Sequence, residues 1–123
     1  MITIDGEDFD IPILSIKRKA EFLDKYAERT EDGVLHRELI GVYFNYELQF
    51  GRTGDLTEYA NLWAKLTEVI EFHEVTVPNF GGTGTQYTFD AYFSNVSDEL
   101  QKESATQTFW KNLTVNFIAK APA

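Results

Sequence analysis

The sequence predicts a mainly β protein of the α+β class, an antiparallel β-sandwich or partly closed barrel with one flanking α-helix at about residues 56–71. Three features support this fold class. Several stretches alternate between apolar and polar side chains with a period of two, and one stretch has apolar residues at helical spacing. No repeat or linker divides the 123 residues, of which 43% are hydrophobic, so we expect one domain spanning residues 1–123.

The first element is expected to be a β-hairpin. Its turn is the Asp5-Gly6 pair, because a tight hairpin turn needs positive φ at its two central residues. The flanking apolar residues are Ile2 and Ile4 before the turn and Phe9, Ile11 and Ile13 after it. Further turn signals occur at Asp32-Gly33, residues 51–54 and residues 81–84.

Residues 15–29 leave two interpretations open. One apolar set recurs at helical spacing, so local propensity leans towards a helix: Ile16, Ala20, Leu23 and Ala27. A second set recurs at every other residue, as in a strand: Ile16, Arg18, Ala20 and Phe22.

A long strand is predicted from His36 to Phe50, because its side chains alternate over the whole stretch. One face carries Ile40, Val42, Phe44, Tyr46, Leu48 and Phe50, and the other carries Arg37, Tyr43, Asn45, Glu47 and Gln49. Such alternation is typical of an antiparallel sheet with one packed face. Further strands are predicted at residues 75–77, 87–93 and 113–119, and the glycine loop at 81–84 joins the first two of these.

One helix is predicted from about Leu56 to Glu71, lying on a sheet. Asp55 is a candidate N-cap, and Glu58 completes a capping box in which each side chain bonds a backbone N–H of the first turn. The apolar stripe of this helix comprises Tyr59, Leu62, Trp63, Leu66, Val69 and Ile70.

The chain is acidic, with 20 acidic residues, 11 basic residues and a formal net charge of −9. Proteins that bind nucleic acid present basic surfaces, so direct sequence-specific binding of nucleic acid is not expected. Residues 38–99 hold ten acidic residues but only two basic residues, Arg52 and Lys65. A solvated face that keeps the protein soluble explains this surplus, and so does an acidic surface that meets a basic one on a neighbouring subunit.

The sequence also bears on location. No run approaches the roughly 20 apolar residues of a membrane span, so no membrane association is expected. The start, Met1 to Asp5, lacks the basic residues and apolar stretch of a signal peptide, which predicts the cytoplasm of the producing cell. With no cysteine, the chain has no disulfide and no thiolate metal site.

No motif predicts enzyme activity, a catalytic residue, a cofactor or a metal. The glycine loop at 81–84 lacks the Lys-Ser/Thr pair of a phosphate-binding loop. His36 and His73 are close in sequence to Glu38 and Glu74, but without the spacing of a metal site, and we expect ordinary residues at strand ends. The carboxylate pair of a hydrolase is recognised by distance in space, so that alternative stays open.

Two aromatic residues are predicted to point away from the packed faces of their strands. Tyr43 lies opposite Phe44, and Trp110 lies opposite Leu113. Either the helix and loops cover this second face, or these side chains lie at an interface, where Tyr and Trp are enriched.

Five strings are spread over nearly the whole chain from about Ile13: AERTEDG at 27–33, RELIGVYFNY at 37–46, HEVTVP at 73–78, TFDAY at 88–92 and WKNLTVNFIA at 110–119. Together they resemble short proteins encoded in tail modules of prophages of Gram-positive bacteria, of the tail-tube or distal-tail type. The resemblance implies a β-sandwich with one flanking helix that assembles as a ring. It also implies a strand from Leu14 to Leu23 entering a long loop, and loops 26–35 and 50–55 that reach neighbouring subunits.

The expected function is therefore a non-enzymatic structural component of a phage-type tail, acting through homo-oligomeric, ring-like assembly. Its partners would be itself and other tail proteins, first in the cytoplasm of the producing bacterium and then in the virion tail. The candidate interface residues are Tyr43, Asn45, Arg52 and Trp110. An acidic bore would repel the DNA backbone and let DNA slide through. The alternative is a small β-rich ligand- or carbohydrate-binding module with exposed aromatic residues.

Overall fold

A computed structural model describes residues 2–53, 55–78, 86–104 and 108–122 of the chain. The glycine loop predicted at 81–84 lies outside these residues. The described elements, in chain order, are β1 (Ile2–Ile4), β2 (Glu7–Phe9), β3 (Ile13–Arg29), β4 (Leu35–Phe50), α1 (Leu56–Leu66), β5 (His73–Pro78), β6 (Gln86–Glu103) and β7 (Thr108–Ala119).

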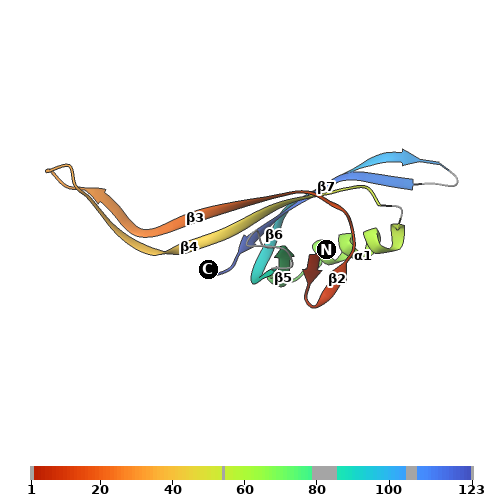
Figure 1. Cartoon of the computed structure of the whole chain (residues 1–123), viewed down its shortest axis with the longest axis horizontal. Helices are drawn as coiled ribbons and strands as arrows, with labels where there is room; N and C mark the ends of the chain where they lie inside the picture. Colours follow the sequence, from red (N-terminus) through yellow and green to blue (C-terminus); the bar gives the residue numbers. More distant parts are fainter. Residues whose placement is uncertain (1, 54, 79–85, 105–107, 123) are drawn as a thin grey trace.

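The strands form one antiparallel sheet in the order β2-β1-β5-β6-β7-β4-β3. The sheet is open, with β2 and β3 as its edge strands. Helix α1, β1, β2 and β5 lie together on the same side of the long strands (Figure 1). The predicted mainly β fold with one flanking helix is confirmed.

The hydrophobic core is a single cluster that joins α1 to the sheet. Its helical members are Tyr59, Leu62 and Leu66, and its members on β4 are Tyr46, Leu48 and Phe50. The remaining buried members come from the N-terminal segment, β5, β6 and β7: Ile2, Ile4, Phe9, Ile11, Val75, Val77, Ala91, Leu113, Val115 and Phe117. The long alternation that predicted β4 therefore corresponds to a packed face only in the second half of the strand.

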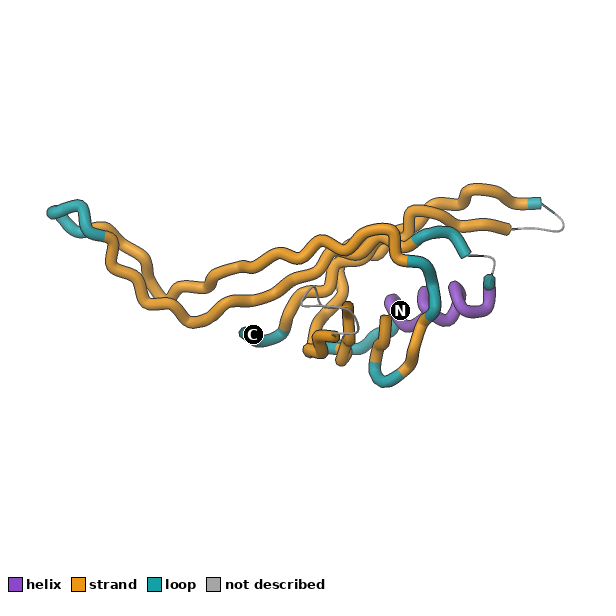
Figure 2. The backbone as a smooth tube through the Cα atoms, in the orientation of Figure 1, coloured by secondary structure: helices purple, strands orange, loops and turns teal. Residues whose placement is uncertain are grey.

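A two-stranded ribbon projects from this core (Figure 2). β4 pairs with β7 only from Tyr46 to Phe50, whereas its pairing with β3 continues outward to the Arg29–Leu35 pair. We call residues 19–45 the arm. At about 3.3 Å per residue, its 11 residues on β3 extend about 35 Å. A second hairpin, the outer parts of β6 and β7, projects at the opposite end of the molecule (Figure 1).

Segment 15–29 lies within β3, so the strand that the resemblance implied from Leu14 to Leu23 is confirmed and the helical spacing was misleading. The long loop predicted at 26–35 is wrong, because β3 continues to Arg29 and only residues 30–34 turn the chain. Gly33 supplies a positive φ of 83°, and the hydroxyl of Thr30 donates to the carboxylate of Asp32. Cross-strand pairing therefore extends the strand to a tight turn, overriding local propensity.

The N-terminal hairpin has the predicted turn, with φ of 52° at Asp5 and 81° at Gly6. Helix α1 is shorter than predicted, because it ends at Leu66 and Thr67 is its C-cap. The hydroxyl of Thr67 donates to the Trp63 carbonyl at 2.8 Å, as does its backbone N–H at 3.0 Å. Val69 and Ile70 lie outside the core, and Val69 is 102% exposed.

The start of α1 confirms half of the predicted capping box. The carboxylate of Asp55 accepts from the backbone N–H of Glu58 at 3.0 Å. The predicted reciprocal bond, from the backbone N–H of Asp55 to the Glu58 side chain, is wrong. The Glu58 carboxylate instead accepts from the backbone N–H of Asp10 at 3.1 Å. The N–H of Asp55 donates to the hydroxyl of Thr53 at 3.2 Å. Glu58 therefore ties the helix to the segment that follows β2.

Candidate functional site

The four predicted interface residues do not form one patch. Tyr43 and Asn45 lie on the arm side of β4, and Arg52 is exposed in the loop that precedes α1. Asn45 has a structural role, because its Oδ1 accepts from the Ala119 N–H at 2.9 Å and its Nδ2 donates to Glu21 at 3.1 Å. It joins β3, β4 and β7 just beyond the last paired residues of β4 and β7.

Trp110 lies on the face of β7 opposite to the predicted one. Asn112 has a φ of 55°, and the register of β6 and β7 shifts between the Ser97–Thr114 and Glu99–Lys111 pairs. This β-bulge adds one residue to β7, so Trp110 and Leu113 share a face although they are three residues apart. Trp110 therefore faces α1.

Trp110 lines a pocket of ≈ 400 Å³ between α1 and the β6–β7 hairpin. The pocket is lined by Leu56, Tyr59, Ala60, Trp63, Asp98 and Trp110. Three of these residues are aromatic, and both tryptophans of the chain are among them. Tyr59 is 7% exposed and Trp110 is 37% exposed, so the lining runs from the core to the surface.

One carboxylate is fixed in this pocket. The Tyr59 hydroxyl donates to Oδ2 of Asp98 at 2.6 Å, a short distance typical of a hydrogen bond to a charged acceptor. Burial raises the pKa of Tyr59, and the hydrogen bond and negative charge of Asp98 raise it further. The phenol therefore stays protonated as a donor and orients Asp98.

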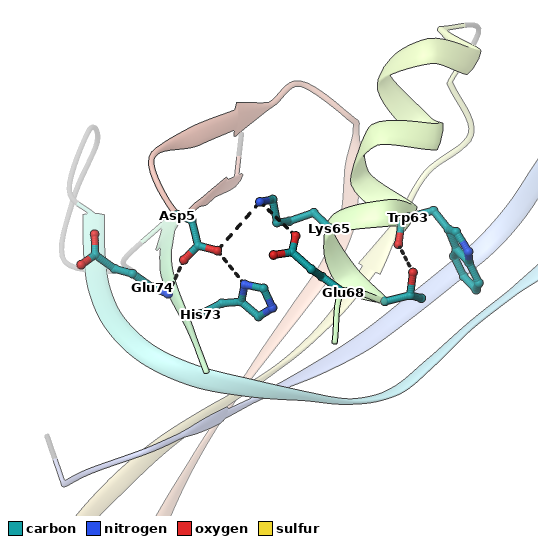
Figure 3. Close-up of polar contacts among 7 residues, drawn as sticks. Asp5, Trp63, Lys65, Glu68, His73 and Glu74 are labelled. Atoms are coloured by element: carbon teal, nitrogen blue, oxygen red, sulfur yellow. Dashed lines mark hydrogen bonds and ion pairs between the residues drawn. The ribbon is translucent and has the colours of Figure 1, made fainter. Parts of the chain in front are cut away.

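A second polar cluster surrounds the turn of the N-terminal hairpin (Figure 3). Nδ1 of His73 donates to Oδ2 of Asp5 at 2.6 Å, and the backbone N–H of Glu74 donates to Oδ1 at 2.9 Å. Nζ of Lys65 is 4.0 Å from Oδ2 of Asp5 and 3.2 Å from the Glu68 carboxylate. The cluster joins β1, β5 and α1.

Burial raises the pKa of Asp5, but the hydrogen bonds from His73 and Glu74 and the charges of His73 and Lys65 outweigh this effect. The pKa of Asp5 is consequently below its ordinary value of 3.8. The side chain of His73 is only 2% exposed, and its ring stacks on that of Phe93 with 4.7 Å between the ring centroids. The sequence suggested Glu74 as the neighbouring carboxylate of His73, whereas the structure pairs it with Asp5.

His73 links β5 to the turn of the N-terminal hairpin through its hydrogen bond to Asp5. Among the described residues, no group of three or more His, Asp and Glu side chains is placed to hold a metal ion. Nothing in the sequence marked Asp5 as the partner, because the two residues are 68 positions apart and only the pairing of β1 with β5 brings them together.

A groove of ≈ 330 Å³ lies at the base of the arm and has mixed charge. Its charged lining comes from β3 and β4, namely Lys17, Lys19, Glu21 and Glu47. Lys19 and Glu21 are 3.1 Å apart, so part of this charge is internally compensated.

The arm itself is rich in exposed apolar side chains. Seven of them are between 44% and 59% exposed: Phe22, Leu23, Tyr26, Val34, Leu35, Leu39 and Ile40. Arg37 lies over the ring of Phe22, 5.2 Å from its centroid, and also forms an ion pair with Asp24. These contacts hold the two strands together but leave much apolar surface in water.

Comparison with known protein families, curated proteins and solved structures finds no match to this chain. Within the described residues, no helix has the length and apolar character needed to cross a membrane.

Proposed function

We propose that this protein is a non-enzymatic structural component of a phage-type tail that acts through homo-oligomeric, ring-like assembly. The observation that carries this proposal is the arm, which places seven partly exposed apolar side chains on a ribbon about 35 Å long. The sequence resemblance to prophage tail proteins supplies the setting, and other tail proteins are the expected further partners.

The arm lacks the packing that stabilises the rest of the sheet. None of its residues from 19 to 45 is buried, whereas the core residues lie on α1, on residues 46–50 of β4 and on the other strands. An isolated two-stranded ribbon is at best marginally stable in water. Contact with a neighbouring copy would give this ribbon the apolar burial that its own chain does not provide.

The two edge strands carry opposite charges. β2 presents Glu7 and Asp8, and Asp10 follows it, whereas β3 carries five basic and three acidic residues. Complementary charge at opposite edges favours head-to-tail association, which closes into a ring when the rotation between copies permits. An acidic bore that repels the DNA backbone then gives the surplus acid of residues 38–99 a function.

The proposal is tested by light scattering after size exclusion, across a series of protein concentrations and salt concentrations. The variant Phe22→Ser/Ile40→Ser removes two arm side chains that are 59% and 54% exposed. Burial of the exposed half of each is worth about 1 kcal/mol, so assembly should weaken about 30-fold.

The control is Val69→Ser, because Val69 is a fully exposed apolar residue outside the arm. It should assemble like the wild type. A strict monomer at all concentrations and in all salts argues against a ring. Unchanged assembly of the arm variant shows that the arm is not the contact.

The pocket favours a second candidate function, a small β-rich binding module for a ligand such as a carbohydrate. Its converging aromatic residues and fixed carboxylate are typical of small-molecule sites. A screen of soluble sugars and small organic ions against the two tryptophan signals tests this candidate. A protein whose tryptophan signals respond to none of them has no such module.

A further inference from the structure

The pocket between α1 and the β6–β7 hairpin combines three aromatic rings with one carboxylate. Tyr59 and Trp63 come from α1, and Trp110 and Asp98 come from the two strands of the hairpin. Two separate elements thus converge on one space of ≈ 400 Å³. This volume falls in the range of about 300–1,000 Å³ that small-molecule sites occupy.

We propose that this pocket is an aromatic cage that binds an alkylated ammonium group, such as the head of a quaternary ammonium compound. Aromatic faces attract cations through their negative π-surface, and recognition of quaternary ammonium by several aromatic side chains is an established use of that attraction. The Asp98 carboxylate adds an opposite charge beside the rings.

The chemistry of the lining favours this ligand over a carbohydrate. A sugar carries many hydroxyl groups, and each one that leaves water needs a hydrogen-bond partner. Besides the two indole N–H groups, the described residues of the lining offer only Tyr59 and Asp98 as polar side chains, and the Tyr59 hydroxyl is already bonded to Asp98. A quaternary ammonium has no N–H group to satisfy, so its transfer into an apolar cage leaves no donor unpaired.

The lining also favours a cation over a neutral apolar group. An apolar ligand would fill the volume but would gain nothing from the carboxylate that Tyr59 holds in place. The surplus of acidic residues in the segment 38–99, which includes all of α1, also attracts positively charged ligands.

This inference deepens the second candidate function and is independent of the first. The arm projects at one end of the molecule, whereas α1 and the β6–β7 hairpin, whose residues line the pocket, lie towards the other end (Figure 1). The cage is therefore available whether or not the arm associates with another copy. Failure of assembly leaves the cage intact. Binding of a neutral sugar would support a binding module and overturn the cation chemistry.

The decisive probe is choline, compared with its neutral isostere 3,3-dimethylbutan-1-ol. Both tryptophans of the chain line the pocket, so tryptophan fluorescence and the two indole N–H signals in NMR report on this site. Choline should shift both indole signals in a saturable manner. The neutral isostere should bind at least about tenfold more weakly, because it loses the cation–π and carboxylate attractions.

Two variants and one matched control complete the experiment. Asp98→Asn keeps an acceptor for the Tyr59 hydroxyl but removes the charge, and it should weaken choline about tenfold. Glu99→Gln removes the same charge one residue away, where the side chain faces Lys111 and Asn112, and should leave binding unchanged.

Trp110→Leu keeps apolar volume at a position that is 37% exposed, but removes one aromatic face, and should weaken choline about tenfold. Trp63 then remains as the single reporter. Equal affinity for choline and its isostere overturns the proposal. So does unaltered choline binding in Asp98→Asn, or a response to N-acetylglucosamine without one to choline.

Discussion

Replacing Asp5 with asparagine removes one negative charge from the cluster at the N-terminal turn while keeping the turn itself. Asn tolerates the φ of 52° at this position, and Asn-Gly is a favoured pair for this type of turn. The carboxylate of Asp5 accepts from His73 at 2.6 Å and from the Glu74 N–H at 2.9 Å. Asparagine has one acceptor oxygen in place of two, so at least one of these bonds becomes weaker.

The expected loss follows from the exposure of the two partners. Hydrogen bonds to charged groups are worth about 1.5–3 kcal/mol, and neutral ones about 1 kcal/mol. The side chain of His73 is 2% exposed, but that of Asp5 is 35% exposed, and solvent screens the charge there. We therefore expect Asp5→Asn to lower the free energy of unfolding by about 1 kcal/mol at neutral pH and the Tm by about 4 °C.

The pH dependence of this loss has a defined sign. The pKa of Asp5 in the folded protein lies below its ordinary value of 3.8, so folding favours the ionised form. The charge contributes fully above that ordinary value, and the contribution is lost as the pH falls through the folded pKa. The difference between wild type and Asp5→Asn should therefore be present at about pH 5 and close towards about pH 2.

Urea unfolding followed by tryptophan fluorescence measures this difference at each pH. Asp10→Asn is the matched control, because it removes the same charge from an exposed position in the same segment and should change stability by less than about 0.5 kcal/mol. A loss for Asp5→Asn that is equally large at both ends of the pH range would refute the role of the charge. No loss at neutral pH would refute the role of the cluster.

Three further variants test the packing of the core, the N-cap of α1 and the hydrogen bond between Asn45 and Ala119. Leu62→Ala should cost about 2–5 kcal/mol in urea unfolding, since Leu62 is 0% exposed, whereas the exposed Asn61→Ala should be nearly neutral. Asp55→Ala should cost about 1 kcal/mol and Asp55→Ser less than half of that, and equal losses would show that the cap does not stabilise α1. Asn45→Ala should cost about 1–2 kcal/mol and speed hydrogen exchange of the Ala119 amide, and unchanged exchange would contradict the bond between them.

The elements with regular local patterns were predictable from the sequence. The turn at Asp5-Gly6, the N-cap Asp55 and the strand β4 each depend on residues close in sequence, and the structure confirms all three. The end of α1 was harder to predict, because Val69 and Ile70 continue the apolar spacing beyond the last helical residue. The helix stops where the backbone leaves the helical conformation, at Thr67, whose φ is −104° and whose ψ is 11°.

The candidate sites depended on contacts between residues far apart in sequence. His73 was visible as a histidine beside a carboxylate, but its partner Asp5 is brought to it by strand pairing across 68 positions. The pocket was not predicted, because it needs Trp63 on the helix and Trp110 on the hairpin to face each other. The spacing of residues within either element does not predict that these two side chains line the same pocket.

The side on which Trp110 lies depends on Asn112, and Asn95 has the same effect on β6. Asn95 on β6 and Asn112 on β7 have φ values of 54° and 55°, and the register of the two strands shifts beside each of them. Every such bulge reverses the alternation of the residues beyond it. Phe93 and Val96 therefore both pack on the core although they are three residues apart, and Trp110 shares the face of Leu113 for the same reason.

A hairpin with unbroken alternation would turn Trp110 away from α1 and leave the pocket without one of its three rings. The sequence does hold a signal for the two bulges, because asparagine is among the few residues other than glycine that readily adopt positive φ. A prediction from strict alternation misses that signal, because it assumes that each strand has no bulge. The positive φ that these asparagines adopt thus determines which side chains of the hairpin line the aromatic pocket. Glu99 and Lys111 lie on the opposite side of the hairpin.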